Sequence, residues 1–132
     1  MLAESPFYAN ILVSDLSRAR AFYEGILGAV ALRIAESEVV YRSGGTQFAI
    51  SRVGDAGPTL HTVGSFIVTD IESAASDLRG RGVEFEQYDL PGLRTVSGIA
   101  TFAGDGVALP DRVAWFRDPD GNLLSIVQEG SS

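Results

Sequence analysis

The sequence of 132 residues contains no cysteine and only one histidine, one methionine and one tryptophan. Without cysteine, disulfides, thiol catalysis and thiolate metal sites are excluded. With His61 as the single imidazole, a metal site would have to use carboxylates almost alone. Basic residues are also few. Ten Lys and Arg against seventeen Asp and Glu give a formal net charge of -7, which repels phosphate backbones and argues against nucleic-acid binding.

Long apolar runs are absent too, so we expect no membrane-spanning segment. Residues 1–8 lack the basic start and the apolar centre of a signal peptide, and we therefore expect a cytoplasmic protein. The composition, 45% hydrophobic and 20% charged, is that of a globular protein. At this length we expect a single domain over residues 1–132, with enough apolar residues to form a core without disulfides or metal ions.

The sequence does contain an internal repeat. The stretch Ile11–Ala19 matches Phe66–Ala74, so that Asp15 aligns with Asp70 at an offset of 55 positions. This repeat predicts two copies of one structural unit. The predicted parts are a first module over about residues 5–54, a linker at 55–58 and a second module over about residues 60–129.

Hydrophobic periodicity predicts a β-α-β-β-β order in the first module. Its helix begins at the capping oxygens of Ser14 and Asp15 and ends at Gly28. The predicted strands cover residues 7–13, 29–34, 39–42 and 47–53, with a turn at 43–46.

The second module is predicted to repeat the first strand and helix and to end in a hairpin. Its helix begins at a capping box formed by Thr69 and Glu72 and ends at Gly80 to Gly82. The predicted strands cover residues 63–68, 83–88 and 99–103, with a loop over 89–95 and a connection over 104–112.

The hairpin, Val113–Val127, is organised by a turn over residues 118–122. Pro119 presets φ at the first corner, and Gly121 accepts the positive φ that closes such a loop. Asp118 and Asp120 are assigned to this turn chemistry rather than to a catalytic pair of carboxylates. On the first arm, strand alternation places Trp115 on one face with Val113 and Arg117.

This hairpin resembles the closing signature of the vicinal oxygen chelate superfamily, which includes glyoxalase I, extradiol dioxygenases, fosfomycin-resistance proteins and bleomycin-binding proteins. The segment from Asp15 to Ala19, followed by Phe22-Tyr23 and Leu27-Gly28, is similar to the family's opening. The resemblance implies an α+β fold over essentially the whole chain. Two β-α-β-β-β modules related by a pseudo-twofold axis would form a curled mixed sheet that encloses a cavity, with the helices outside.

In the family, members that use a metal place one ligand on each of four strands that line the cavity. The resemblance carries these positions to Tyr8, Ala49, Val63 and Ser125, and Ser125 replaces the Glu of the family's hairpin motif. Valine and alanine cannot bind a divalent ion, and neutral Ser and Tyr are poor donors. We therefore expect no metal and no other cofactor. His61 shares the strand parity of Val63, but a lone histidine is more often a surface residue than a ligand.

Without a metal, the cavity is expected to bind a small organic ligand, cationic or aromatic in character. We expect an apolar and aromatic lining with a few hydroxyl and amide groups, as in other ligand pockets. The predicted lining residues are Tyr8, Asn10, Ala49, Val63, Ser65, Trp115 and Ser125. Trp115 is either a stacking surface for the ligand or a core residue beside a dimer partner. Partly open sheets expose strand edges, so we also expect a symmetric homodimer.

The sequence leaves three functions open. The first is a metal-free small-molecule-binding protein, similar in principle to the bleomycin-binding relatives. The second is an enzyme: a lyase or dioxygenase whose metal site lies elsewhere, or one that works by acid-base chemistry through Tyr8, with Asn10 orienting the substrate. The third is a regulatory subunit with a vestigial cavity. The sequence assigns neither a catalytic residue nor the identity of the ligand.

Overall fold

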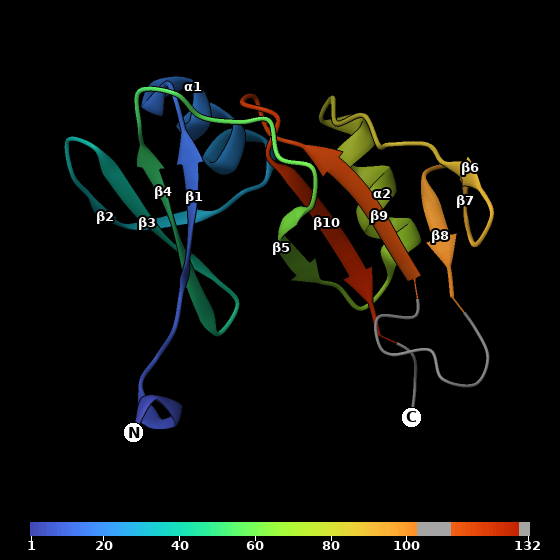
Figure 1. Cartoon of the computed structure of the whole chain (residues 1–132), viewed down its shortest axis with the longest axis horizontal. Helices are drawn as coiled ribbons and strands as arrows, with labels where there is room; N and C mark the ends of the chain where they lie inside the picture. Colours follow the sequence, from blue (N-terminus) through green and yellow to red (C-terminus); the bar gives the residue numbers. More distant parts are fainter. Residues whose placement is uncertain (103–111, 130–132) are drawn as a thin grey trace. The chain divides into compact units, whose positions relative to one another are not determined.

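A computed structural model of the chain describes residues 1–102 and 112–129. The chain divides into two compact units (Figure 1). Unit 1 comprises Met1–Pro58 with Asp118–Asn122, and unit 2 comprises Thr59–Arg117 with Leu123–Ser132. Each unit contains its own sheet and its own α-helix, so the predicted α+β class is confirmed. The predicted strand end at Ala103 and most of the predicted connection over 104–112 lie outside the described residues.

Unit 1 has the order of strands and helix that the sequence predicts. Asp15 caps helix α1 (Leu16–Arg20), because its carboxylate accepts a hydrogen bond from the backbone amide of Arg18 at 3.0 Å. The helix continues as a π-helix, η2 (Ala21–Ile26), and stops before Gly28. The remaining elements are η1 (Leu2–Glu4), β1 (Ala9–Val13), β2 (Val30–Ile34), β3 (Glu38–Ser43) and β4 (Thr46–Arg52).

The sheet of unit 1 has the strand order β1-β4-β3-β2, with β1 parallel to β4 and the other neighbours antiparallel. One face of this sheet buries the cross-strand partners Tyr41 and Phe48. The ring of Tyr23 packs on these two side chains, with centroid distances of 6.2 Å and 5.8 Å. Burial of each such side chain stabilises the fold by about 1.5 to 3 kcal/mol.

The turn over Asp118–Asn122 belongs to unit 1 and is held by its own first carboxylate. Asp118 accepts hydrogen bonds from the backbone amides of Asp120 at 3.0 Å and Asn122 at 2.8 Å. It also accepts bonds from the side-chain amide of Asn122 and from the hydroxyl of Tyr23, both at 2.8 Å. Gly121 has the predicted positive φ, 86°. The assignment of Asp118 to turn chemistry is therefore confirmed.

Unit 2 repeats this plan and adds two strands. Asp70, the repeat partner of Asp15, caps helix α2 (Ile71–Gly80) through the backbone amide of Ser73 at 3.2 Å. The strand order is β5-β10-β9-β8-β7-β6, and its first four strands have the order and directions found in unit 1. The strands are β5 (Thr62–Ile67), β6 (Asp89–Leu90), β7 (Leu93–Val96), β8 (Ile99–Thr101), β9 (Arg112–Arg117) and β10 (Leu123–Gln128).

The predicted capping box of Thr69 and Glu72 is wrong. The carboxylate of Asp70 occupies the capping position, and Glu72 instead pairs with Arg112 at 3.4 Å. An aspartate side chain competes well for the first free amides of a helix, and the repeat already places one at position 70.

The predicted strand over 83–88 and the predicted loop over 89–95 are also wrong. Only one bridge forms in the first segment, between Phe85 and Phe116. The alternation of Val83 and Phe85 reflects burial of both side chains and not strand pairing. The second segment carries β6 and the start of β7, joined by a turn in which Gly92 has a φ of 79°.

Removing the hydroxyl that reaches the turn tests this core. Tyr23→Phe keeps the ring but removes one donor from the buried Asp118 carboxylate, so we expect the free energy of unfolding to fall by about 1 to 3 kcal/mol. Urea denaturation measures this loss. The control Tyr8→Phe alters a ring that is 37% exposed and should change stability by less than about 0.5 kcal/mol. Equal stabilities of the two variants would contradict the assigned role of the bond.

The same variant should change the response to alkaline pH. Burial, followed by the charge of Asp118, raises the pKa of Tyr23 above its ordinary value. A tyrosine in the unfolded chain ionises near pH 10, and here the folded state holds the proton more tightly. The stabilisation is therefore complete below about pH 10 and is lost as the pH rises further. Tyr23→Phe should lose less stability above this pH than the unaltered protein.

Candidate functional site

One face of the sheet in unit 2 carries three of the residues predicted for the site. Ser125 on β10 pairs in register with Trp115 on β9 and with Ser65 on β5, so the three side chains form one row across three strands. Residues of opposite parity face α2: the side chain of Gln128 accepts a hydrogen bond from the backbone amide of Ile71, at 2.8 Å, at the start of the helix. The row therefore lies on the face that α2 does not cover.

At the middle of this row, two hydroxyl groups bind each other. The oxygens of Ser65 and Ser125 are 2.7 Å apart, and Ser125 is 1% exposed. Each hydroxyl has one hydrogen and two acceptor lone pairs. The mutual bond uses one hydrogen, so the pair retains one donor and several acceptor sites for a third polar group. The two neutral hydroxyls can therefore orient an uncharged polar group of a ligand by hydrogen bonding.

An aromatic pair continues the row. The ring of Trp115 meets the ring of Tyr88 edge to face, with centroids 5.6 Å apart and planes at 86°. Trp115 is half-buried, and its carbonyl accepts a hydrogen bond from the backbone amide of Glu86 at 2.8 Å, which fixes the segment that carries Tyr88. Sequence reasoning missed Tyr88 because it was placed at the end of a strand that does not form.

A charged pair lies two residues beyond Trp115 on the same strand. The guanidinium of Arg117 binds the carboxylate of Glu86 at 2.8 Å and the carbonyl of Thr59 at 2.9 Å. Both partners are about a third exposed, at 35% and 34%. The two opposite charges therefore balance each other within one ion pair.

The fourth predicted residue of unit 2, Val63, lies at an irregular position. Leu123 pairs with Thr62 and Leu124 pairs with Gly64, so Val63 is the extra residue of a β-bulge and is half-buried. His61 precedes β5 and is exposed.

Unit 1 holds the remaining predicted site residues. Asn10 on β1 pairs in register with Ala49 on β4, whose side chain is fully buried. Tyr8 precedes β1 and is 37% exposed. A single cavity lined by both sets of residues stays a prediction.

Asn10 also belongs to a polar chain that sequence reasoning missed. The hydroxyl of Ser51 lies 3.4 Å from the side-chain oxygen of Asn10 and 3.3 Å from a carboxylate oxygen of Glu38. One hydroxyl hydrogen can serve only one of these acceptors at a time. Glu38 and Ser51 are cross-strand partners, and the pairing follows from the predicted turn at 43–46, which offered a signal for the contact.

The chain belongs to the glyoxalase/bleomycin resistance protein/dioxygenase superfamily, because the model of that family matches residues 6–126. The resemblance seen in the sequence is thereby confirmed. The search of curated proteins found no match.

Solved structures share the fold at low sequence identity. A glyoxalase/bleomycin resistance protein/dioxygenase from Alicyclobacillus acidocaldarius is 18% identical, with a TM-score of 0.71 over 97% of this chain and 93% of that chain. The fosfomycin resistance protein FosX from Listeria monocytogenes, complexed with Mn(II) and a sulfate ion, is 19% identical, with a TM-score of 0.68 over 96% and 91%. A glyoxalase/bleomycin resistance protein from Catenulispora acidiphila is 24% identical, with a TM-score of 0.61 over 93% and 96%. At these identities the likeness shows the fold alone.

The manganese ion of the Listeria protein raises the question of whether this chain can hold one. The four positions carried over from the family offer a phenol at Tyr8, a hydroxyl at Ser125 and no donor atom at Ala49 or Val63. Divalent ions of this kind prefer carboxylates and imidazoles. Among residues 1–102 and 112–129, no three His, Asp or Glu side chains gather into a group that could hold a metal ion. The described residues therefore do not fit the metal.

Within the described part of the chain, no helix is both long enough and apolar enough to span a bilayer. The cytoplasmic location stays a prediction.

Metal analysis of the purified protein tests the donor argument. We expect no stoichiometric zinc, nickel, iron or manganese by plasma mass spectrometry, and no shift of Tm when a chelator is added. Ser125→Glu restores the carboxylate of the family motif and serves as a matched comparison. If the donor argument is wrong, the unaltered protein should bind metal at least as tightly as this variant. One equivalent of tightly held metal in the unaltered protein would contradict the argument.

Proposed function

We propose that the protein binds a small organic ligand without a metal ion, on the open sheet face that carries Trp115, Ser65 and Ser125. The observation that supports this most directly is the hydroxyl pair. Ser125 stands where the family motif has a metal-binding Glu, and it is buried against Ser65 at 2.7 Å. A buried neutral pair costs little when each hydroxyl has a partner, whereas a buried carboxylate without a metal or another partner would be costly.

The aromatic pair supports an aromatic or cationic ligand. Trp115 is held edge to face by Tyr88 and is only half-buried, so its position is fixed while the residue stays partly accessible. A cation placed over an indole face is attracted by the ring's quadrupole, and an aromatic ligand stacks on it. The net charge of -7 favours a cation over an anion as the ligand.

A second candidate is an enzyme that works by acid-base chemistry on the sheet face of unit 1 that carries Asn10. The observation that favours it is the contact of Glu38, Ser51 and Asn10, which places a carboxylate, a hydroxyl and an amide next to one another. A carboxylate of this kind can act as a general base when a substrate lies within hydrogen-bond distance. Conversion of a bound ligand into a product by the protein would select this candidate over simple binding.

The proposal also includes a symmetric homodimer. Strand β2 ends the sheet of unit 1 and exposes three apolar side chains, Val30, Leu32 and Ile34, by 47%, 44% and 59%. A sheet edge with unpaired backbone groups and apolar side chains is a surface that proteins normally cover. Pairing with a second copy of the chain would cover it.

The fluorescence of Trp115, the only tryptophan, tests the binding proposal. Benzyltrimethylammonium, which is both aromatic and cationic, should quench or shift this fluorescence in a saturable manner. By calorimetry, Trp115→Ala should weaken binding by about 1 to 3 kcal/mol, and Trp115→Phe, which keeps an aromatic face, should weaken it less. Circular dichroism checks that both variants fold.

Two outcomes would count against this site. The first is a folded Trp115→Ala variant that binds the probe with unchanged affinity. The second is that the unaltered protein shows no saturable binding of any probe in a panel of neutral aromatic and cationic compounds. Either result would show that the row of Ser65, Ser125 and Trp115 is not the ligand-binding site.

Light scattering after size exclusion tests the dimer. We expect a mass of twice the 14.0 kDa of the chain at micromolar concentration. Ile34→Glu adds a charge at the exposed edge strand and should shift the equilibrium toward the monomer. Leu60→Glu alters a side chain that is 93% exposed and serves as the control. A monomeric mass for the unaltered protein would refute the dimer.

A further inference from the structure

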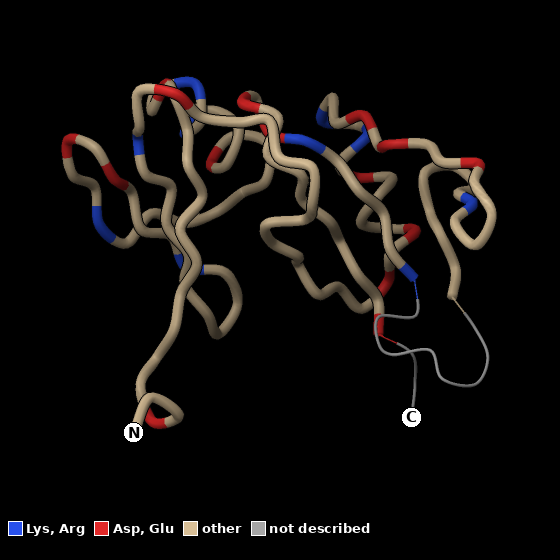
Figure 2. Tube along the Cα trace, viewed as in Figure 1, with Lys and Arg blue, Asp and Glu red and all other residues tan. Residues whose placement is uncertain are grey.

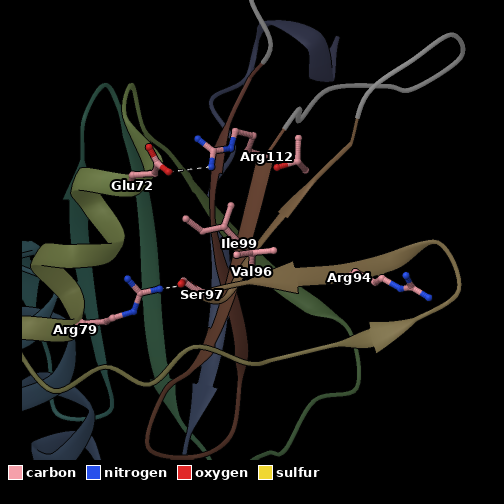
Figure 3. A pocket seen from close by; sticks show the side chains of 8 residues that line it. Glu72, Arg79, Arg94, Val96, Ser97, Ile99 and Arg112 are labelled. Carbon is pink, nitrogen blue, oxygen red and sulfur yellow. Dashed lines mark hydrogen bonds and ion pairs between the residues drawn. The ribbon is translucent and has the colours of Figure 1, made fainter.

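A pocket of about 350 Å³ lies within unit 2, on the side of the sheet that faces α2 (Figure 3). Its lining comes from α2 and from strands β7, β8 and β9, with the turn between β7 and β8. The lining residues are Glu72, Arg79, Arg94, Val96, Ser97, Ile99, Thr101 and Arg112. The volume is at the lower end of the range for small-molecule sites.

The strand register places this pocket on the opposite face from Trp115 and Ser125. Val96 pairs with Ile99, and Ile99 pairs with Ala114, so these side chains share one face. Trp115 follows Ala114 and therefore points to the other face. The pocket is thus separate from the face to which the proposed function belongs, and it does not depend on that function.

Two arginines reach the pocket from different elements. Arg79 lies on α2, seven residues after Glu72 and hence on the same side of the helix, and Arg112 lies at the start of β9. Figure 3 shows Arg79 and Arg112 at two ends of the pocket, with Ile99 and Val96 between them, while Arg94 points away from the other side chains. Arg94 pairs instead with Asp89 at 3.1 Å in an exposed ion pair.

The side chain of Arg79 is positioned without a carboxylate. It donates to the carbonyl of Ser97, and its guanidinium carbon lies 5.2 Å from the centre of the Phe85 ring. Ser97 and Gly98 both have positive φ, 52° and 80°, in the tight turn that presents this carbonyl. A Cβ at position 98 would lie 2.7 Å from the Cβ of Phe85, so glycine allows the close approach. Within residues 1–102 and 112–129, no acidic side chain forms an ion pair with Arg79.

The charge of Arg112 is balanced only in part. Its contact with Glu72 is 3.4 Å long, and the Glu72 side chain is 72% exposed, so solvent weakens this pair. Among the described residues that line the pocket, one carboxylate, that of Glu72, faces the guanidinium groups of Arg79 and Arg112, which leaves a positive charge there. In a chain with a net charge of -7, whose acidic residues are spread over both units (Figure 2), such a concentration of positive charge does not follow from the overall composition.

We infer that this pocket binds a small organic anion through its carboxylate or phosphate group. Guanidinium groups match such oxyanions because they donate two parallel hydrogen bonds. The hydroxyls of Ser97 and Thr101 supply further donors, and Ile99 and Val96 supply an apolar surface for the organic part. Since the pocket is larger than a bare inorganic ion requires, the occupant combines an oxyanion head with a small apolar body.

A titration of the full chain followed by nitrogen-15 NMR tests this inference. The probes are phenyl phosphate, benzoate and inorganic phosphate, with phenol as the uncharged control, all at constant ionic strength. We expect saturable shifts of the Ser97 and Thr101 amides with phenyl phosphate or benzoate, weaker binding of inorganic phosphate, and no saturation with phenol. A preference for phenyl phosphate over benzoate would identify the head group as phosphate, and the reverse preference would identify it as carboxylate.

Variants assign the binding to the two arginines. The double variant Arg79→Gln/Arg112→Gln should weaken binding by about tenfold or more, because two charge-assisted contacts are lost. Arg81→Gln, at the end of the same helix but outside the pocket lining, should leave it unchanged within about twofold. Val96→Trp keeps all charges but fills the pocket from a side chain that is 79% exposed, and it should also weaken binding.

Several results would overturn the inference. One is the absence of saturable shifts with every anionic probe, and another is equal weakening by Arg81→Gln and by the double variant. If the double Gln variant does not fold, Arg79→Lys/Arg112→Lys decides, since it keeps the charge but loses the paired donors. Binding by this Lys variant that equals binding by the unaltered protein would also refute the assignment.

Discussion

The buried carboxylate of Asp118 is the group on which unit 1 most depends. It is 5% exposed, and four hydrogen bonds reach its two oxygens. A carboxylate offers about four acceptor sites, and burial is tolerated when these sites are filled. The side chain of Asn122, which donates to Asp118, also donates to the carbonyl of Leu12 on β1 at 2.8 Å. Asp120 accepts from the backbone amide of Ser14 at 3.1 Å and pairs with Arg18 at 3.2 Å. Satisfying one buried charge therefore fixes the turn, the end of β1 and the start of α1 together.

Much of the fold was predictable because it follows from local rules that act twice. The repeat aligns Asp15 with Asp70, and each carboxylate caps a helix. Period-two alternation placed the strands of unit 1 within a few residues of their observed bounds. The segment over 83–96 was not predictable in this way. Its apolar alternation serves burial of Val83 and Phe85, and its short hairpin is fixed by the hydroxyl of Thr95, which accepts from the backbone amide of Tyr88 at 2.9 Å. Contacts of this kind depend on side chains brought together by the rest of the fold.

The candidate site, too, was predictable from the sequence only in part. Alternation within the terminal hairpin placed Trp115 and Ser125 on one face, and the register confirms that they are direct cross-strand partners. Ser65 joins them because β5 lies parallel to β10 and pairs with it in register. Tyr88 and Glu86 were missed because the sequence placed them in a strand over 83–88 that does not form. The arginine pocket was missed for a different reason: Arg79 and Arg112 are 33 positions apart and line one pocket only because α2 packs on the sheet.

The two faces of the sheet in unit 2 differ in chemical character, and strand register separates them. One face presents the hydroxyl pair, the aromatic rings and the ion pair of Arg117 with Glu86, and the other presents the guanidinium groups of the pocket around an apolar floor. Adjacent residues such as Ala114 and Trp115 point to opposite faces, so a slip of one residue would exchange the two surfaces. The bulge at Val63 lies on β5, the edge strand, and the ladder between β9 and β10 is free of any such irregularity from Arg112 to Arg117. The central pair of strands thus keeps the two faces distinct, while the edge absorbs the mismatch.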